Sequence, residues 1–307
     1  MRIAWMAALT LLAAACTGSA SRQLQSGQLD GGASQGNGGV LTSPSAGCGK
    51  PVAATGSVAL TATDANGTAR TYEVEVPAPY RADQPLPVVF YFHGQNGNIQ
   101  ESKGYSQFLA VPEMVAGALI VYPQGIGYTD PQGVDWGVGW DGTPSCGGRD
   151  LAFFDAMLEH VKSTYCIDSN RVFVSGFSWG TDFADALACC RTSKIRALSV
   201  GSGDEVLVWN PRCVDLPTLP ALRLTYATND AYTQAQFDEK IGVFKHGLGC
   251  SSASTSASDN LGGTNAGTCK SYQGCAKPLV ECVYPNMAHR LPSNFGVATW
   301  AFFSSFH

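Results

Sequence analysis

Apolar segments of strand length alternate with helical patterns along most of this chain, and this alternation constrains the fold more than any other feature. The segments "RTYEVEVP", "LPVVFYFHG" and "ALIVYPQG" each predict a strand. They are followed by "DLAFFDAMLEHVKSTY", in which apolar residues recur at helical spacing behind Asp150, a residue type that favours a helix N-cap.

The alternation continues to the end of the sequence. "RVFVSG", "IRALSVGSG" and "ALRLTYATND" predict further strands, with helices between them at 178–190 and 234–246. The chain closes on "FGVATWAFFSSF", a predicted terminal helix. Strands that alternate with helices indicate an α/β fold with a mostly parallel central sheet and helices on both of its faces.

The sequence divides into three parts. Residues 1–15 place Arg2 before a short apolar run, which is typical of an export signal peptide. Residues 16–47 are rich in Gly, Ser and Gln and predict a flexible tether. Residues 48–307 are long enough for one large α/β domain, and the low-complexity segment 251–268 is expected to be a surface loop.

Cys16 directly follows three alanines, as in bacterial lipoprotein processing sites, where such a cysteine is lipidated. Ordinary signal cleavage nearby is the alternative. The protein is therefore expected to be either secreted or tethered to the cell surface through a lipid anchor at Cys16.

Ten cysteines remain after Cys16, an even number that allows complete pairing in an exported protein. Their spacing lacks the paired ligands of a zinc site, so disulfides are favoured over a metal. The pattern of "CKSYQGCAKPLVEC" suggests two strands around a Pro-bearing turn, which would place Cys269 opposite Cys282.

The formal net charge is −5, and no cluster of Lys and Arg occurs anywhere in the chain. These properties argue against nucleic acid or an anionic membrane as a partner. Nothing in the sequence favours one oligomeric state over another or calls for a cofactor.

The sequence Gly176-Phe177-Ser178-Trp179-Gly180 fits the pattern G-x-S-x-G. The pattern alone is common, but here it follows a predicted strand and opens a predicted helix, as it does around the nucleophile of serine hydrolases. We therefore expect Ser178 to be a nucleophile held in a strained turn, with the helix N-terminus favouring negative charge. The alternative is an incidental serine in a Gly-rich turn.

A serine hydroxyl needs a base, and in this type of sheet the chain order is Ser, then Asp or Glu, then His. Among the histidines after Ser178, His246 falls within a predicted helix and His307 is the last residue. His289 lies in "YPNMAHRLPS", between a strand and the final helix. His289 is therefore the predicted base.

The acid should follow a strand between Ser178 and His289. Asp230 ends the apolar segment "ALRLTYATND", where its carboxylate could orient the imidazole. Asp204, just past another strand, is the rival, and we favour Asp230 on position.

The transition state of acyl transfer needs two donors for its oxyanion. The backbone N–H of Trp179, directly after the nucleophile, is one candidate, and that of Gln95 in "VVFYFHGQNGN" is the other. His93, at a strand end in the same segment, is expected to brace the loop rather than to bind a metal or act as a base.

Residues 133–150, "GVDWGVGWDGTPSCGGRD", predict a Gly-rich loop with Trp136 and Trp140. Exposed indoles there would suit an aromatic or sugar-containing substrate. An equally weighted alternative is that both tryptophans cap the core.

Taken together, several segments resemble the secreted feruloyl esterases of carbohydrate esterase family one and the neighbouring extracellular polyhydroxybutyrate depolymerases. The resemblance covers residues 46–306 and rests on "SAGCGKP", "RTYEVEVPAPY", "VVFYFHG", "IVYPQG", "YCIDSNRVFVSGFSWG", "ATND" and "NMAHRLP". It implies an α/β-hydrolase fold and a triad of Ser178, Asp230 and His289. The chain departs from the family at Thr181, where a second glycine is common, and in Cys146 and Cys190, which look additional.

The resemblance implies a serine carboxylic ester hydrolase, first of all a feruloyl esterase that releases hydroxycinnamate from plant cell-wall polysaccharide. Depolymerisation of a polyester such as polyhydroxybutyrate and deacetylation of xylan are the alternatives within the same chemistry. A non-catalytic binding protein on a hydrolase scaffold is the alternative of another class, against which the order of Ser, Asp and His argues.

Overall fold

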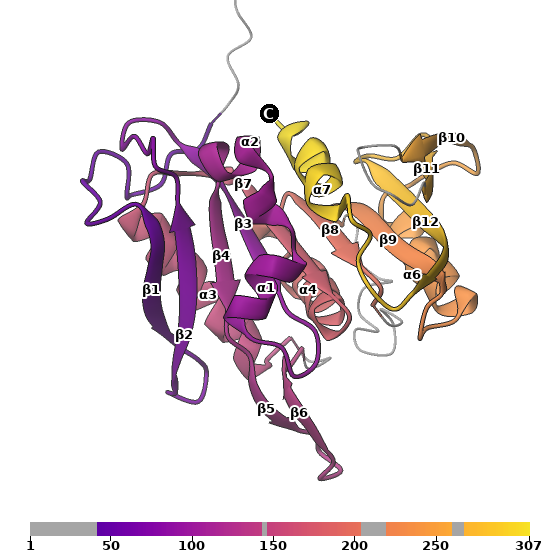
Figure 1. The fold of residues 1–307 in the computed structure, drawn as a ribbon, viewed down its shortest axis with the longest axis horizontal. Helices are drawn as coiled ribbons and strands as arrows, with labels where there is room; N and C mark the ends of the chain where they lie inside the picture. The colour runs from indigo at the N-terminus through magenta and orange to yellow at the C-terminus, as the bar shows by residue number, and fades with distance from the viewer. Residues whose placement is uncertain (1–41, 143–145, 204–218, 260–266) are drawn as a thin grey trace, which may run out of the picture. The chain divides into compact units, whose positions relative to one another are not determined.

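The structure is a computed structural model that describes residues 42–142, 146–203, 219–259 and 267–307. The predicted signal peptide, Cys16 and most of the predicted tether lie outside the described residues, as do Asp204 and Cys213. The compact unit spans Val40–His307 and is built on one 10-stranded sheet (Figure 1).

The order of the strands across this sheet is β1-β2-β4-β3-β7-β8-β9-β12-β11-β10, and β5 and β6 form a separate two-stranded sheet. The strands are β1 (Gly56–Thr63), β2 (Ala69–Val76), β3 (Leu86–Phe92), β4 (Leu119–Pro123), β5 (Ile126–Thr129), β6 (Asp135–Gly139), β7 (Ile167–Phe177), β8 (Ala197–Gly201), β9 (Ala221–Asn229), β10 (Ser254–Asp259), β11 (Gly267–Tyr272) and β12 (Leu279–Ala288). The helices are α1 (Ile99–Tyr105), η1 (Phe108–Ala110), α2 (Pro112–Gly117), α3 (Arg149–Thr164), α4 (Trp179–Cys190), η2 (Thr192–Lys194), α6 (Gln234–Gly247) and α7 (Phe295–Ser304).

The middle of the sheet is parallel and its edges are antiparallel. Strands β4, β3, β7, β8, β9 and β12 pair in parallel with one another. Strands β1 and β2 on one side, and β10 and β11 on the other, pair antiparallel. Parallel strands need crossover connections, which helices provide here, so the carboxyl ends of the central strands meet at one edge.

Both faces of the central strands are covered by helices, which explains why their sequences are almost wholly apolar. Strand β3 is buried along its whole length. Its residues alternate between two core clusters: Phe90 packs with residues of α3 and α4, and Tyr91 packs with residues of η1, α2 and α7. The predicted mostly parallel sheet with helices on both faces is therefore confirmed.

Most predicted elements occur within one or two residues of the expected bounds, and the exceptions are informative. The segment 251–268, expected as a surface loop, contains β10, which pairs antiparallel with β11. The expected Gly-rich loop 133–150 begins instead with β6, which forms a hairpin with β5. Both predictions were wrong because backbone pairing stabilises short strands in segments that lack an apolar pattern.

Asp150 was expected as the N-cap of α3, but the cap residue is Gly148. Asp150 lies in the first turn of the helix, fully buried, with Oδ1 2.7 Å from the guanidinium of Arg70. A buried ion pair between β2 and α3 therefore takes the place of the expected cap.

The structure contains disulfides, as predicted. They join Cys48–Cys166, Cys146–Cys190, Cys250–Cys275 and Cys269–Cys282, and Cys189 is disulfide-bonded as well. Cys269 and Cys282 are direct partners in the β11–β12 register, so the predicted juxtaposition is confirmed.

The last residues of the segment assigned to the tether pack on the domain. The backbone N–H of Ser45 donates to the carbonyl of Ile167, and its hydroxyl donates to the carbonyl of Tyr165. The packed part of the chain therefore reaches back before Cys48. Over the described ranges, no helix has the length and apolar character required to cross a membrane.

Candidate active site

Ser178 occupies a sharp turn between β7 and α4. Its backbone has φ 54° and ψ −126°, a conformation that a residue with a side chain rarely adopts. A Cβ on Gly176 would lie 2.3 Å from the carbonyl oxygen of Gly180, and one on Gly180 would lie 2.0 Å from that of Phe92. Both glycines of the motif are therefore required by close backbone contacts.

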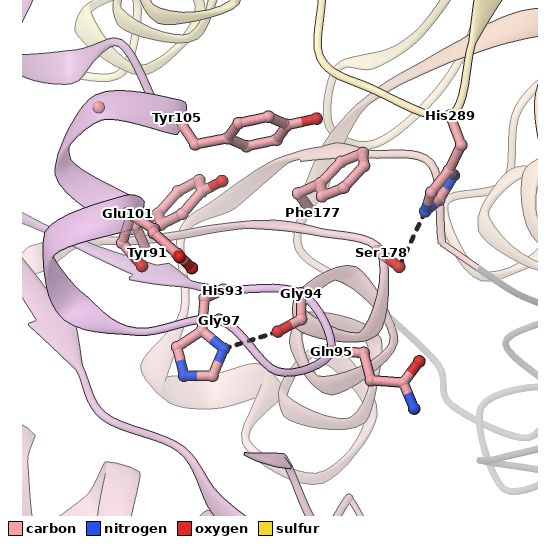
Figure 2. Close-up of a pocket in the computed structure, with 12 residues that line it drawn as sticks. Tyr91, His93, Gly94, Gln95, Gly97, Glu101, Tyr105, Phe177, Ser178 and His289 are labelled. Atoms are coloured by element: carbon pink, nitrogen blue, oxygen red, sulfur yellow. Dashed lines mark hydrogen bonds between the residues drawn. The ribbon is translucent and has the colours of Figure 1, made fainter. Parts of the chain in front are cut away.

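The structure brings Ser178, His289 and Asp230 together in one hydrogen-bonded chain. The Nε2 atom of His289 lies 2.9 Å from Oγ of Ser178, and its Nδ1 atom lies 2.7 Å from Oδ1 of Asp230. Figure 2 shows the contact between His289 and Ser178 at one side of a cavity. The arrangement can pass the hydroxyl proton of Ser178 to the imidazole while the carboxylate fixes the tautomer.

The three side chains meet because their strands are neighbours. Strand β8 lies between β7 and β9, and β9 pairs in parallel with β12. Ser178, Asp230 and His289 each follow the last residue of β7, β9 and β12. The carboxyl ends of parallel strands share one edge of the sheet, so residues far apart in the sequence converge there.

The carboxylate of Asp230 is held by a second donor that the sequence analysis missed. The hydroxyl of Ser202 donates to Oδ2 of Asp230 at 2.6 Å. Burial acts to raise the pKa of Asp230, but the hydrogen bonds from His289 and Ser202 outweigh it, so the pKa lies below its ordinary value. Asp230 therefore stays ionised next to the imidazole. Ser202 directly follows β8, and this position at the active edge was the available signal.

Both residues expected to supply oxyanion donors lie next to the nucleophile. Trp179 is the first residue of α4, so its N–H has no acceptor within the helix. A Cβ on Gly94, the neighbour of Gln95, would lie 3.3 Å from Cβ of Ser178. Gln95 itself lines the cavity in front of Ser178 (Figure 2).

The β5–β6 hairpin holds the loop that carries Gln95. The side chain of Gln95 donates from Nε2 to the carbonyl of Trp136 at 2.7 Å. Asn96 forms two hydrogen bonds with Val138: its N–H donates to the carbonyl at 2.7 Å, and its Oδ1 accepts from the N–H at 2.9 Å. This bracing was not predicted because residues 133–150 were expected to be a loop, although Asp130-Pro131-Gln132-Gly133 has the residue types of a turn.

His93 braces the same loop, as expected. Its Nδ1 lies 2.7 Å from the carbonyl oxygen of Gly94, and its Nε2 accepts from the N–H of Gly125 at 2.9 Å. Nδ1 therefore carries the proton, and burial lowers the pKa of His93, which favours the neutral imidazole. No group of three His, Cys, Asp or Glu side chains within the described ranges could hold a metal ion.

The expectation that Trp140 contacts substrate is corrected, because its side chain is 1% exposed. Its indole packs against Phe92 and Phe183, and its Nε1 donates to the carbonyl of His93. The alternative assignment, a tryptophan that caps the core, describes Trp140. Trp136, by contrast, is 43% exposed on β6.

A cavity of about 670 Å³ opens in front of Ser178 and His289. Its walls include three aromatic side chains that the sequence analysis did not single out: Tyr91, Tyr105 and Phe177 (Figure 2). The rings of Tyr105 and Phe177 are 4.9 Å apart, and Phe177 also packs against the imidazole of His289 at 4.7 Å. The volume is within the range of cavities that bind small organic ligands.

No protein-family model matches this chain. It is 29% identical over 287 residues to feruloyl esterase D of Neurospora crassa, and the alignment covers 87% of this chain and 92% of that protein. It is 26% identical to feruloyl esterase C of Emericella nidulans, over 84% of this chain and 90% of that protein. The similarity to feruloyl esterases that the sequence motifs predicted is confirmed.

Among solved structures, an acetyl xylan esterase from Aspergillus awamori superposes with a TM-score of 0.61 at 17% identity, covering 80% of this chain and 99% of that one. An S-formylglutathione hydrolase from Agrobacterium tumefaciens superposes with a TM-score of 0.53 at 13% identity, covering 81% and 95%. Together with the strand order, these likenesses establish the α/β-hydrolase fold.

Proposed function

We propose that this protein is a serine carboxylic ester hydrolase that acts as a feruloyl esterase, releasing hydroxycinnamic acids from plant cell-wall polysaccharide. In this proposal Ser178 is the nucleophile, His289 the base and Asp230 the acid. The backbone N–H groups of Trp179 and Gln95 are the oxyanion donors.

One observation carries the proposal: the hydrogen-bonded chain of Ser178, His289 and Asp230 opens onto a cavity of about 670 Å³ with aromatic walls. A nucleophile with its base supports acyl transfer. An aromatic cavity of this size supports a planar aromatic acyl group rather than an acetyl group, which would leave most of the space unfilled.

The reaction would follow from the geometry. His289 takes the proton of Ser178 as its Oγ attacks the ester carbonyl, and the N–H groups of Trp179 and Gln95 stabilise the oxyanion. The alcohol leaves with the proton from His289, and the acyl group stays on Ser178. Water, activated by the same imidazole, then hydrolyses the acyl-enzyme and restores the hydroxyl.

Deacetylation of xylan is the second candidate. It is favoured by the likeness to the Aspergillus awamori acetyl xylan esterase and by 29% identity over 140 residues to a bifunctional acetylxylan esterase/xylanase of Neocallimastix patriciarum. That second match covers 46% of this chain and 19% of the relative. The same triad would serve both reactions, so the acyl group decides between them.

The named relatives and the disulfides support an extracellular location for this chain, because disulfides persist in an oxidising environment outside the cell. A lipid anchor at Cys16 remains part of the proposal as the alternative to ordinary cleavage. The mass of the N-terminal peptide of the mature protein distinguishes the two forms.

The test measures initial hydrolysis rates on methyl ferulate, an acetylated xylo-oligosaccharide and a hydroxybutyrate oligomer, for the wild type and Ser178→Ala. Fastest cleavage of methyl ferulate supports the proposal, and fastest cleavage of either other ester replaces it. Ser178→Ala should lower kcat by about a millionfold while thermal unfolding stays unchanged. Retained turnover in this variant would remove Ser178 from the mechanism.

A further inference from the structure

Tyr91 is a buried tyrosine whose hydroxyl points to no partner among the described residues, although it lines the cavity in front of Ser178. Its side chain is 1% exposed, and its Oη atom forms no hydrogen bond with any described residue. A buried hydroxyl without a partner costs free energy, so such groups in native proteins generally meet a water or a ligand. The position of this one on a cavity wall indicates a ligand.

The ring of Tyr91 is fixed by its neighbours. It packs edge-on against Phe108 at 5.5 Å and against Tyr122 at 6.2 Å, deep in the cluster formed with η1 and α2. Because these contacts hold the ring, its hydroxyl occupies a set position on the residue that lines the cavity. Burial raises the pKa of Tyr91 well above its ordinary value, so the hydroxyl keeps its proton and can both donate and accept.

The position of Tyr91 relative to Ser178 follows from strand register. Tyr91 on β3 pairs with Ser175 on β7, and Ser178 comes three residues later, about 10 Å farther along the strand direction. Figure 2 shows Tyr91 at one end of the cavity and Ser178 with His289 at the other, with Tyr105 and Phe177 between them.

We infer that Tyr91 determines acyl specificity by hydrogen-bonding the 4-hydroxyl of a hydroxycinnamoyl group whose carbonyl lies at Ser178. The aromatic ring of the acyl group would lie along Tyr105 and Phe177. This inference rests on the proposed function and adds to it the residue that distinguishes a phenolic acyl group from an unsubstituted one. A site built to bond a hydroxyl discriminates against the analogue that lacks it, because its own polar group is then left unpaired.

The experiment compares kcat/KM for methyl 4-hydroxycinnamate and methyl cinnamate in the wild type and in Tyr91→Phe. The wild type should prefer the hydroxylated ester, and Tyr91→Phe should reduce this preference by about tenfold, mainly through the hydroxylated ester. For each protein, the preference is the ratio of kcat/KM for the hydroxylated ester to kcat/KM for methyl cinnamate. Dividing the wild-type ratio by the Tyr91→Phe ratio cancels the intrinsic reactivities of the two esters. The thermal unfolding temperature of Tyr91→Phe should equal that of the wild type or lie slightly above it, because the variant removes an unpaired buried hydroxyl.

Tyr122→Phe is the matched control. Tyr122 is a buried neighbour on the same face of the sheet, but its hydroxyl lies 3.2 Å from Oγ of Ser106 and it does not line the cavity. This variant should lose stability and keep the wild-type preference between the two esters.

The outcomes separate the inference from the function. An equal preference in the wild type and Tyr91→Phe, with both esters cleaved, overturns the role of Tyr91 and leaves the feruloyl esterase proposal standing. Cleavage of the acetylated oligosaccharide but of neither cinnamate overturns both. A loss of stability in Tyr91→Phe as large as in Tyr122→Phe, with an unchanged preference, assigns the hydroxyl of Tyr91 to the fold.

Discussion

The hydroxyl of Ser202 donates to Oδ2 of Asp230 at 2.6 Å, on the carboxylate oxygen that does not face His289. The carboxylate is thus held on both oxygens, and its pKa is lowered by both hydrogen bonds against the opposing effect of burial. The orientation of the imidazole therefore depends on a residue outside the Ser, His and Asp set.

Ser202→Ala should lower kcat by about tenfold and move the acidic limb of the pH profile of kcat/KM to higher pH. The lost hydrogen bond favours the ionised form, so its removal raises the pKa of Asp230. The pKa of Asp230 is lower in the folded protein than its ordinary value of 3.8. Ionised Asp230 therefore stabilises the folded state at pH values above 3.8, and this stabilisation is lost as the pH falls through the pKa of the folded protein. Steady-state kcat and kcat/KM, together with unfolding curves, measured from about pH 3 to about pH 8, test both effects.

Ser175→Ala is the control for this experiment. Ser175 is buried and donates to the carbonyl of Ser199 at 2.6 Å, but it contacts none of the three site residues. It should cost about 1 kcal/mol of stability and leave the pH profile in place. A pH profile of Ser202→Ala that coincides with that of Ser175→Ala would show that Ser202 serves only the fold.

Asn96→Ala should lower kcat and leave KM nearly unchanged, because Asn96 holds the loop that carries Gln95, the proposed second oxyanion donor. Asn96 also has φ 59°, a conformation that asparagine tolerates better than alanine. Asn96→Gly separates the two effects, since it keeps the backbone conformation and removes only the side-chain bond. Steady-state kinetics with methyl ferulate provide the measurement. A rise in KM by the same factor as the fall in kcat would point to substrate binding instead.

Lys240→Met should destabilise the protein by about 3 to 5 kcal/mol, because it leaves the buried carboxylate of Asp185 without its cation. The two groups lie 2.6 Å apart between α4 and α6, and both are essentially unexposed. Burial raises the pKa of Asp185, so the cost of the lone carboxylate is smallest at low pH and grows as the pH rises.

The double variant Asp185→Asn with Lys240→Met removes the uncompensated charge and should recover much of the loss. Urea unfolding at pH 5 and pH 8 checks both statements. Similar stability of Lys240→Met and the wild type at pH 8 would contradict them.

Trp136→Ala should leave hydrolysis of methyl ferulate unchanged and lower the rate on feruloylated polysaccharide, since its indole is exposed on β6 and an exposed indole suits contact with a sugar chain. Trp140→Ala, in contrast, should cost about 3 to 5 kcal/mol of stability through a core cavity. Parallel unfolding and kinetic measurements on both variants make this comparison. Equal rates of wild type and Trp136→Ala on the polysaccharide would exclude Trp136 from substrate binding.

The sequence predicted the parallel sheet and the positions of Ser178, Asp230 and His289 because each follows a strongly apolar strand. Such a pattern depends on local residues and on the rule that carboxyl ends of parallel strands meet at one edge. Chain order and strand ends were therefore enough to select one histidine among five.

The rest of the site depends on contacts that no local pattern encodes. Strand β6 around Trp136 consists largely of Gly, Asp and Val, and its pairing with β5 and its bonds to Asn96 arise only in the folded chain. Tyr91 lies in an apolar strand and Trp140 in a Gly-rich segment, and the fold alone decides that Tyr91 lines the cavity while Trp140 packs in the core.

The contact between Ser178 and His289 joins residues 111 positions apart, and β12, which precedes His289, is the last strand in chain order within the described ranges. Ser178 therefore lacks its contact with His289, the proposed base, until nearly the whole domain has assembled, because long-range contacts of this kind form only when the intervening chain is in place. Ester hydrolysis is thus a sensitive reporter of complete folding, and a chain that stops before β12 would retain Ser178 and be inert.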